Sequence, residues 1–156
     1  MARITANDLK RWVETKSRDC QARLPELARR LVRASSPTAS GVDVPAGDSV
    51  VLGGWDGRVD ASQGGTNVPF GSSGWEIGSE KGVKGKADED YEKRSQKPGR
   101  SSPWRIYVCL RHPSAWSKKR TWERDCKAKG VWRDVLALDG EELARISQTR
   151  MRDLRF

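Results

Sequence analysis

The segments GGWDGRV (Gly53–Val59) and GWEIGS (Gly74–Ser79) each set one carboxylate in a short apolar stretch flanked by glycine. Each stretch predicts a strand. A carboxylate at such a place loses solvation unless a cation or a hydrogen-bond donor compensates it. If the two strands are neighbours, Asp56 and Glu76 can hold one divalent metal ion through hard oxygen ligands. In a strongly basic chain, such a pair indicates chemistry on a phosphate backbone.

The composition predicts a single basic domain. A chain of 156 residues predicts one domain, and 35% apolar against 33% charged residues predicts a compact core. Thirty basic and twenty-one acidic residues give a net charge of +9 and a pI of about 9.8. This balance favours a polyanionic partner, either nucleic acid or anionic lipid. The alternative is that the excess of lysine and arginine only keeps the domain soluble.

The cysteines and the hydropathy indicate a cytoplasmic protein. Cys20, Cys109 and Cys126 are odd in number and lack the CxxC spacing of zinc sites, which fits a reducing compartment. Cys109 lies in an apolar segment and is predicted to be a buried thiol. No apolar run approaches the roughly 20 residues that a membrane helix needs, and no signal peptide begins the chain.

The first half of the chain predicts two helices followed by strands. Thr5 and Asp8 form a capping box, so a helix is expected to begin near Ala6, with Ile4 packing on Leu9. Pro25 opens or interrupts a second helix, and residues 35–47 form a loop. Residues 49–61 predict a strand pair or one bent strand broken at the Gly53–Gly54 pair. Residues 62–73 are expected to form a mobile loop before a short strand at residues 75–79.

The second half alternates between helix and strand. Residues 84–94 predict a charged surface helix, residues 105–111 a central strand, residues 116–129 a helix ending at Gly130, and residues 135–138 the last strand. Asp139 and Glu142 cap a final helix. Such alternation predicts an α/β fold with a mixed central sheet flanked by helices on both faces.

The carboxylates of the pair can also be interpreted as structural residues, and the role of a third acid, Glu26, has two interpretations. Asp56 can belong to a turn and accept hydrogen bonds from local amides, as an Asp before Gly often does. Glu76 is harder to explain in this way because apolar residues flank it in the strand. Glu26 on the second helix is either a third carboxylate of the site or a solvated residue favoured by the helix dipole.

The cation that phosphodiester hydrolysis needs is not where the strand would place it. Gly78 stands two residues after Glu76, where a lysine would project to the same face. Lys86 opens the next helix and can point back over the strand end. Lys81 and Lys84 fit an ordinary solvated run of charge.

Other chemistries lack their residues. His112 is the only histidine, which disfavours a zinc or Ser-His site, and it is expected at the surface of a strand end. The sequence contains neither GK[ST] nor GxGxxG for phosphate binding. The acidic run at residues 88–92 lacks the glycine and the spacing of a calcium loop.

Four features together resemble the PD-(D/E)XK restriction-endonuclease-like superfamily. They are Glu26 on an N-terminal helix, GWDG at residues 54–57, WEIG at residues 75–78 and KADEDYEKR at residues 86–94. More narrowly, the chain resembles nuclease-like domains at the N-termini of larger bacterial proteins, several of them antiviral defence NTPases. The resemblance covers roughly residues 3 to 144, so residues 1–144 are taken as a nuclease-like domain and residues 145–156 as a basic tail.

The resemblance implies an αβββαβ core and DNA cleavage that depends on Mg²⁺ or Mn²⁺. Asp56 and Glu76 would hold the metal, and Glu26 would match the helix carboxylate that many members place beside it. The lysine of the superfamily normally follows its acid by two positions, where this chain has Gly78. Lys86 is therefore the candidate for that role.

The resulting hypothesis is a cytoplasmic DNA endonuclease of anti-phage defence with Asp56, Glu76 and Lys86 in catalysis. The residues expected to contact DNA phosphates are Arg58, Lys84, Arg94, Lys118, Lys119 and Arg120. A homodimer and association with a larger defence complex are both open. One alternative is a catalytically inactive nucleic-acid-binding or adaptor domain of the same fold, which Gly78 favours. Another is a protein-interaction module without a role on nucleic acid.

Overall fold

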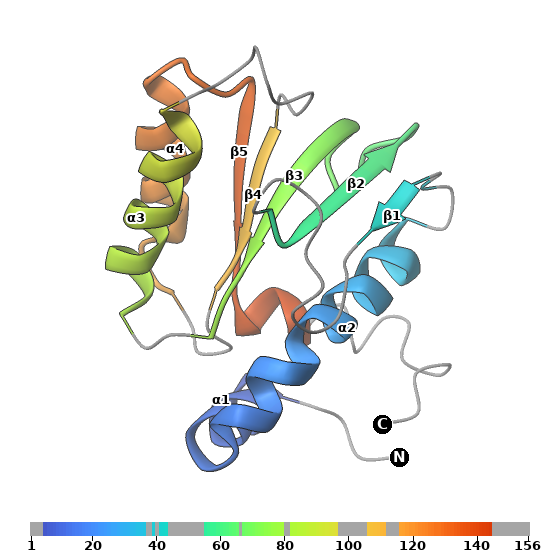
Figure 1. Ribbon diagram of the computed structural model, residues 1–156, viewed down its shortest axis with the longest axis vertical. Coiled ribbons are helices and arrows are strands. Elements are labelled where there is room, and N and C mark those ends of the chain that lie inside the picture. The colour runs from blue at the N-terminus through green and yellow to red at the C-terminus, as the bar shows by residue number, and fades with distance from the viewer. Residues whose placement is uncertain are drawn as a thin grey trace.

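A five-stranded mixed sheet forms the centre of the computed structural model (Figure 1). Its strands lie side by side in chain order: β1 (Gly41–Asp43), β2 (Gly57–Ala61), β3 (Gly71–Ile77), β4 (Ile106–Leu110) and β5 (Asp134–Leu138). The β1–β2 and β2–β3 pairs are antiparallel, and the β3–β4 and β4–β5 pairs are parallel. The structure describes residues 5–36, 39, 41–43, 55–65, 67–79, 82–96, 106–111 and 116–144.

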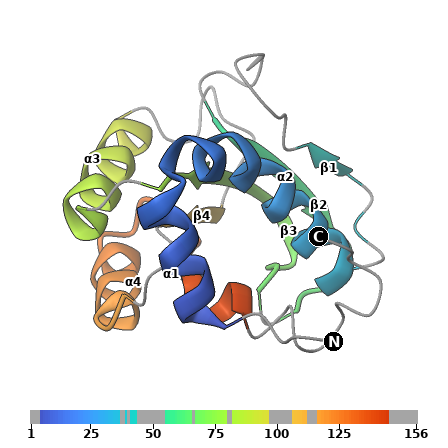
Figure 2. The ribbon, with the colours of Figure 1, turned by 90° about the horizontal axis from the view of Figure 1, so that it is seen from below.

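Helices cover both faces of the sheet, as the sequence predicts. Helices α1 (Ala6–Thr15) and α2 (Ser17–Ser35) lie on one side, and α3 (Val83–Ser95) and α4 (Lys119–Ala128) lie on the other (Figure 2). Helices α3 and α4 each connect two parallel strands. Because successive crossovers of one hand that move along a sheet in one direction place their helices on the same face, α3 and α4 share a face.

Strand β4 shows how one short sequence serves two cores. All five of its residues are buried. Ile106, Val108 and Leu110 pack in the core beneath α2, whereas Tyr107 and Cys109 pack in the core beneath α3 and α4. This alternation is the period of two of a strand buried on both faces. The prediction of an internal apolar strand at this position is confirmed.

The two N-terminal helices differ in how well local signals predict them. Thr5 Oγ1 accepts a hydrogen bond from the Asp8 N–H at 3.2 Å, and Asp8 Oδ2 accepts one from the Thr5 N–H at 2.8 Å, so the capping box is confirmed. The prediction that Pro25 opens or interrupts the second helix is wrong, because α2 begins at Ser17 and continues through the proline. The buried α2 residues Leu24, Leu27 and Leu31 offset the hydrogen bond that proline removes.

Two strands differ from their predicted bounds. The predicted loop at residues 35–47 contains β1, which pairs with β2 between Val42 and Val59. Strand β3 begins at Gly71, within the predicted loop at residues 62–73, and this glycine has a φ of 100° that a residue with a side chain rarely adopts. Of the predicted strand at residues 49–61, β2 occupies residues 57–61. Ile4 and residues 51–54 lie outside the described part of the chain.

The C-terminal elements agree with their predictions. Helix α3, helix α4 and strand β5 all form, and Gly130 follows α4 with a φ of 70°. Residues 140–144 are helical. Asp139 Oδ1 accepts a hydrogen bond from the Glu141 N–H at 2.8 Å, and Glu142 Oε2 accepts one from the Asp139 N–H at 3.1 Å, which confirms the predicted cap. Residues 145–156 and His112 lie outside the described residues.

The three cysteines are buried free thiols, which confirms the prediction for Cys109. Burial raises the pKa of the Cys109 thiol to about 12. Among the helices that the structure describes, none is both long enough and apolar enough to cross a bilayer.

Two neighbouring tyrosines in the core beneath α3 and α4 give opposite stability predictions. The Tyr91 hydroxyl donates to the Cys126 carbonyl at 3.0 Å, whereas the buried Tyr107 hydroxyl has no hydrogen-bond partner in the described structure. We expect Tyr91→Phe to lower the free energy of unfolding by about 1 kcal/mol and Tyr107→Phe to leave it unchanged or raise it by about 1 kcal/mol. Urea denaturation of both variants measures the two changes, and equal losses would contradict the packing of this core.

Candidate functional site

Asp56 lies beside Glu76 where the regular pairing of β2 with β3 ends. The antiparallel register stops at Gly57, which pairs with Trp75. The Asp56 N–H donates to the Trp75 carbonyl at 3.0 Å, one residue out of that register. Since Trp75 packs beneath α2, the next residue of the strand, Glu76, faces the α3 side of the sheet. The side chain of Asp56 contacts that of Glu76 there.

Each carboxylate has one oxygen held by a donor of the protein. Asp56 Oδ2 accepts a hydrogen bond from the Ile77 N–H at 2.8 Å. Glu76 Oε1 accepts one from Arg94 Nε, and the Arg94 guanidinium also lies 5.0 Å from the centre of a Trp55 ring. Asp56 thus does bond a backbone amide, as its second interpretation requires, but the amide belongs to the neighbouring strand and the bond turns the carboxylate toward Glu76.

Glu76 is an unusual acid. It is only 5% exposed, and burial raises its pKa to about 7 from an ordinary value of 4.5. The hydrogen bond from Arg94 lowers this pKa, while the charge of Asp56 and a side-chain contact with Asp56 raise it. The two carboxyl groups are therefore close enough to affect one another. Such mutual repulsion is what a bound cation would relieve.

A second chain of charges lies on the same face. Lys86 Nζ lies 3.3 Å from Asp90 Oδ1, and Asp90 Oδ2 accepts a hydrogen bond from Arg111 Nη2 at 2.8 Å. Lys86 keeps 30% of its side chain exposed, whereas Arg111 is 2% exposed. The pKa of Lys86 is raised: burial lowers it, but Asp90 and Glu89 raise it by more.

Arg111 occupies the position beside Gly78. Ile77 pairs with Leu110 in the parallel register, and the Gly78 N–H donates to the Leu110 carbonyl at 3.0 Å, so Gly78 and Arg111 are the next neighbours. Arg111 follows Cys109 by two residues and therefore shares its face. The buried Nε and Nη1 of Arg111 have no hydrogen-bond partner in the described structure. A neighbouring strand thus supplies a cation where β3 has a glycine.

Sequence reasoning did not single out Arg111 or Asp90. The signal for Arg111 is its spacing of two residues from Cys109 in the predicted strand, which places a cation on the buried face. The signal for Asp90 is its position one helical turn after Lys86. Neither signal shows that Arg111 lies beside Gly78, because the pairing of β3 with β4 determines that neighbour.

Glu26 is not part of the carboxylate pair. It lies on α2, across the sheet from the pair, where its Oε1 accepts a hydrogen bond from Arg30 at 2.6 Å and lies 3.8 Å from Arg29. Across the part of the chain that the structure describes, no three acidic, histidine or cysteine side chains form a group that could hold a metal ion. Among the described residues, the site offers a metal ion two carboxylates, those of Asp56 and Glu76.

Two of the predicted phosphate contacts, the buried Lys119 and the half-buried Arg94, are bound to carboxylates of the protein. The Lys119 ammonium lies 2.9 Å from Asp139 and 2.5 Å from Glu142, with 9% of its side chain exposed. Arg94 keeps 12% of its side chain exposed and is bound to Glu76. A buried cation that already neutralises a carboxylate is not available to a phosphate of the solvent.

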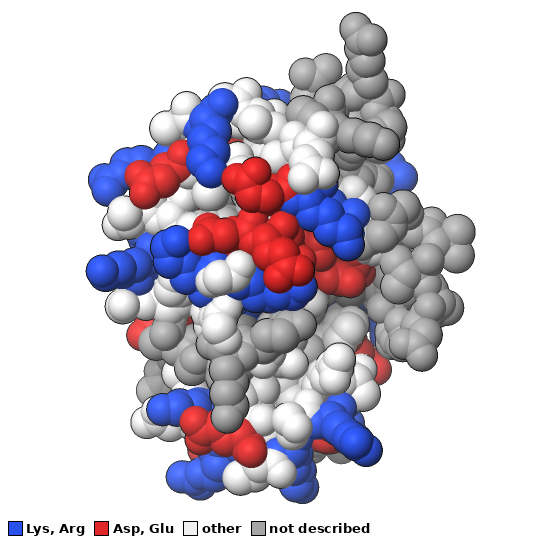
Figure 3. Space-filling model, turned by 60° about the vertical axis from the view of Figure 1, so that its left-hand side comes forward, with Lys and Arg blue, Asp and Glu red and all other residues white. Residues whose placement is uncertain are grey.

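The other predicted contacts lie on a surface of mixed charge. Three of them are ion-paired: Arg58 with Asp60 at 3.0 Å, Lys84 with Asp88 at 2.7 Å, and Arg120 with Glu142 at 2.7 Å. Lys118 is the N-cap residue of α4. On the side of the molecule that carries α3 and α4, acidic and basic side chains are interleaved (Figure 3). This side is not a continuous cationic surface.

Comparison with known proteins does not assign the site. No protein-family model matches the chain, and no significant match was found among curated proteins or solved structures.

Glu76→Gln is expected to change the pH dependence of stability. Because the pKa of Glu76 is raised on folding, its contribution to stability is present below about pH 4.5 and is lost as the pH rises through about 7. We expect the variant to melt within about 1 °C of the wild type at pH 5 and about 5 °C or more above it at pH 8.5. Thermal denaturation followed by circular dichroism measures both differences.

The matched control is Glu92→Gln, which removes an exposed carboxylate of α3 that pairs with Lys129. It should change the melting temperature little at either pH. A Glu76→Gln variant that shifts the melting temperature equally at pH 5 and pH 8.5 would show that Glu76 titrates normally.

Proposed function

We propose that the chain is a cytoplasmic, metal-dependent DNA endonuclease with a restriction-endonuclease-like core. The observation that carries the proposal is the cross-strand pair of Asp56 and Glu76 on one face of the sheet. The chain order of α2, β1, β2, β3, α3 and β4 supports it, because the αβββαβ core implied by the resemblance has the same order. In this chain Asp56 directly precedes β2, and Glu76 lies near the end of β3.

The chemistry of the pair fits a small divalent cation. Mg²⁺ is commonly bound through one or two carboxylates, with waters and substrate phosphate oxygens completing its coordination. Asp56 and Glu76 would be those ligands, and each has one oxygen already oriented by the protein. When bound, the ion would neutralise charge on the phosphoryl oxygens and make a water molecule more acidic.

The surrounding residues prepare the carboxylates and supply positive charge. Arg94 favours the ionised form of Glu76 and fixes the orientation of its carboxylate. Lys86 is the more exposed cation of the site and would stabilise the charge that develops on the phosphate. One carboxylate oxygen of Asp90 pairs with Lys86, and the other pairs with Arg111. Arg111 would therefore position Lys86 through Asp90 and would not touch the substrate.

Two observations favour an alternative, a nucleic-acid-binding domain that has lost catalysis. Gly78 removes the lysine from β3, and Arg94 already provides Glu76 with a positive partner. An arginine in that place can substitute for a metal ion as a neutralising charge. This alternative predicts DNA binding without cleavage and no tight binding of Mg²⁺ or Mn²⁺.

Asp56→Asn tests the proposal with little change of shape. The amide oxygen can still accept from the Ile77 N–H, but the charge that would hold the metal is removed. We expect cleavage of plasmid DNA in Mg²⁺ or Mn²⁺ to fall by at least about a hundredfold. We expect binding of Mn²⁺, followed by electron paramagnetic resonance, to weaken by at least about tenfold, because one of two charged ligands is lost.

Asp60→Asn is the matched control, since Asp60 is an acid of the adjoining strand β2 that is held by Arg58 and Ser72. It should retain both cleavage and binding of Mn²⁺. Wild-type protein that neither cleaves DNA nor binds Mn²⁺ would exclude the endonuclease. Binding of DNA by that same protein would then support the inactive domain.

A further inference from the structure

Helix α2 has two flanks with different surroundings. On one flank, Arg23, Glu26, Leu27 and Arg30 line a cavity of about 480 Å³ together with residues of α1. On the other flank, residues 21, 24 and 25 line a cavity of about 60 Å³ together with Ile77, Gly78 and Ser79. The second flank therefore borders the end of β3, two residues beyond Glu76.

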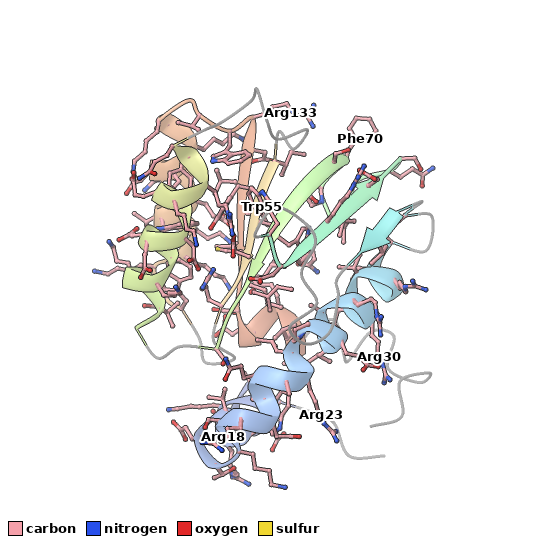
Figure 4. All side chains as sticks on the ribbon, in the orientation of Figure 1. Arg18, Arg23, Arg30, Trp55, Phe70 and Arg133 are labelled. Atoms are coloured by element: carbon pink, nitrogen blue, oxygen red, sulfur yellow. The ribbon has the colours of Figure 1, made fainter. Side chains whose placement is uncertain are left out.

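The arginines on the α1 flank are neutralised by their neighbours. Arg23 Nε lies 3.0 Å from Asp19, and Arg30 Nη2 lies 2.6 Å from Glu26. Acid and base alternate along this row at a spacing of one helical turn. Arg23 and Arg30 are both labelled in Figure 4, where they extend from one side of α2.

A second row of arginines lies on the outward side of α2, between its two flanks. Arg18, Arg29 and Arg33 are separated by eleven and by four residues, which correspond to about three turns and one turn of helix, so they lie on one face. Ala22 and Pro25 occupy the intervening turns, and Glu26 lies at the edge of the row, 3.8 Å from Arg29. We call Arg18, Arg29 and Arg33 the arginine row.

Two arginines of the row, Arg18 and Arg33, carry charge that the described structure does not neutralise. Arg18 and Arg33 are exposed and form no ion pair with any described residue, and Arg29 has only a contact of 3.8 Å with Glu26. The row is about 22 Å long at 1.5 Å per residue, which corresponds to the rise of roughly six to seven base pairs of duplex DNA. Pro25 lies within the row and also lines the cavity beside Gly78.

We propose that the arginine row binds the phosphate backbone of DNA and leads it past Gly78 to the Asp56–Glu76 pair. This inference deepens the proposed function, because it names the surface that presents DNA to that site. On the α3 and α4 side, the exposed Lys93, Lys118 and Arg124 also form no ion pair with a described residue, but acids are interleaved with the cations of that side (Figure 3). The arginine row lies beside Pro25, which lines the cavity next to Gly78.

The test compares two double variants that remove the same charge from the same helix. Arg18→Gln with Arg33→Gln removes two members of the row, and Arg23→Gln with Arg30→Gln removes two ion-paired arginines. Binding of the full chain to a fluorescein-labelled 20-base-pair duplex is followed by anisotropy over a range of salt concentrations. EDTA is present throughout, so that cleavage plays no part.

We expect the row variant to bind at least about tenfold more weakly at 100 mM salt and to reduce the slope of log K against log salt by about two. The control variant should bind within about threefold of the wild type. Equal losses in both variants would overturn the proposal, because they would show a response to net charge alone. Wild-type protein without salt-dependent DNA binding would also overturn it.

Two further measurements distinguish this proposal from the proposal of an endonuclease and from binding to anionic lipid. Cleavage by the row variant at saturating DNA should match that of the wild type. If the wild-type protein binds DNA through the row but does not cleave it, the proposal of an endonuclease is contradicted and the proposal of DNA binding by the row is not. Vesicles that contain anionic phospholipid provide the other polyanion. Loss of vesicle binding in the row variant, with DNA binding unchanged, would overturn the assignment of DNA as the partner.

Discussion

The pairing of β2 with β3 is the constraint on which the site depends. The register that opposes Gly57 to Trp75 buries the indole beneath α2 and turns the next residue, Glu76, to the opposite face, where its side chain contacts Asp56. A slip of one residue would send Glu76 into the apolar core beneath α2. The burial of Trp75 therefore fixes where the acids lie, so a packing interaction on one face of the sheet determines the electrostatics of the other.

Local signals in the sequence predict much of the fold, whereas the site depends on contacts between distant segments. The capping residue Thr5 and the apolar run of β4 specify their elements without tertiary information. Strand β1 has three residues and exists through its pairing with β2, so a local pattern does not reveal it. In the same way, the carboxylates that pair with the buried Lys119 follow it by about twenty residues, so a local pattern does not reveal this contact. The sequence does predict that Asp56 and Glu76 are neighbours, but not that Arg94 binds Glu76.

The positive net charge has a meaning that composition alone does not give. Much of the basic charge on α3 and α4 neutralises nearby carboxylates, either at the surface, as Lys84 does, or within the interior, as Lys119 does. On α2, Arg23 and Arg30 are ion-paired, whereas Arg18 and Arg33 form no ion pair with a described residue. A buried cation stabilises the fold around its acid partner, while exposed, unpaired arginines can attract a polyanion. Position relative to the acids thus decides the role of each cation.

The pKa of the Glu76 carboxyl group is the most direct measure of the cross-strand pair. Nuclear magnetic resonance titration of selectively ¹³C-labelled glutamate side chains, with Glu76→Gln to assign the signal, gives this pKa in the wild type and in Asp56→Asn. The structure predicts a value of about 7 in the wild type and a lower value once the Asp56 charge is removed. A Glu76 that titrates near 4.5 and does not respond to Asp56→Asn would contradict the pairing.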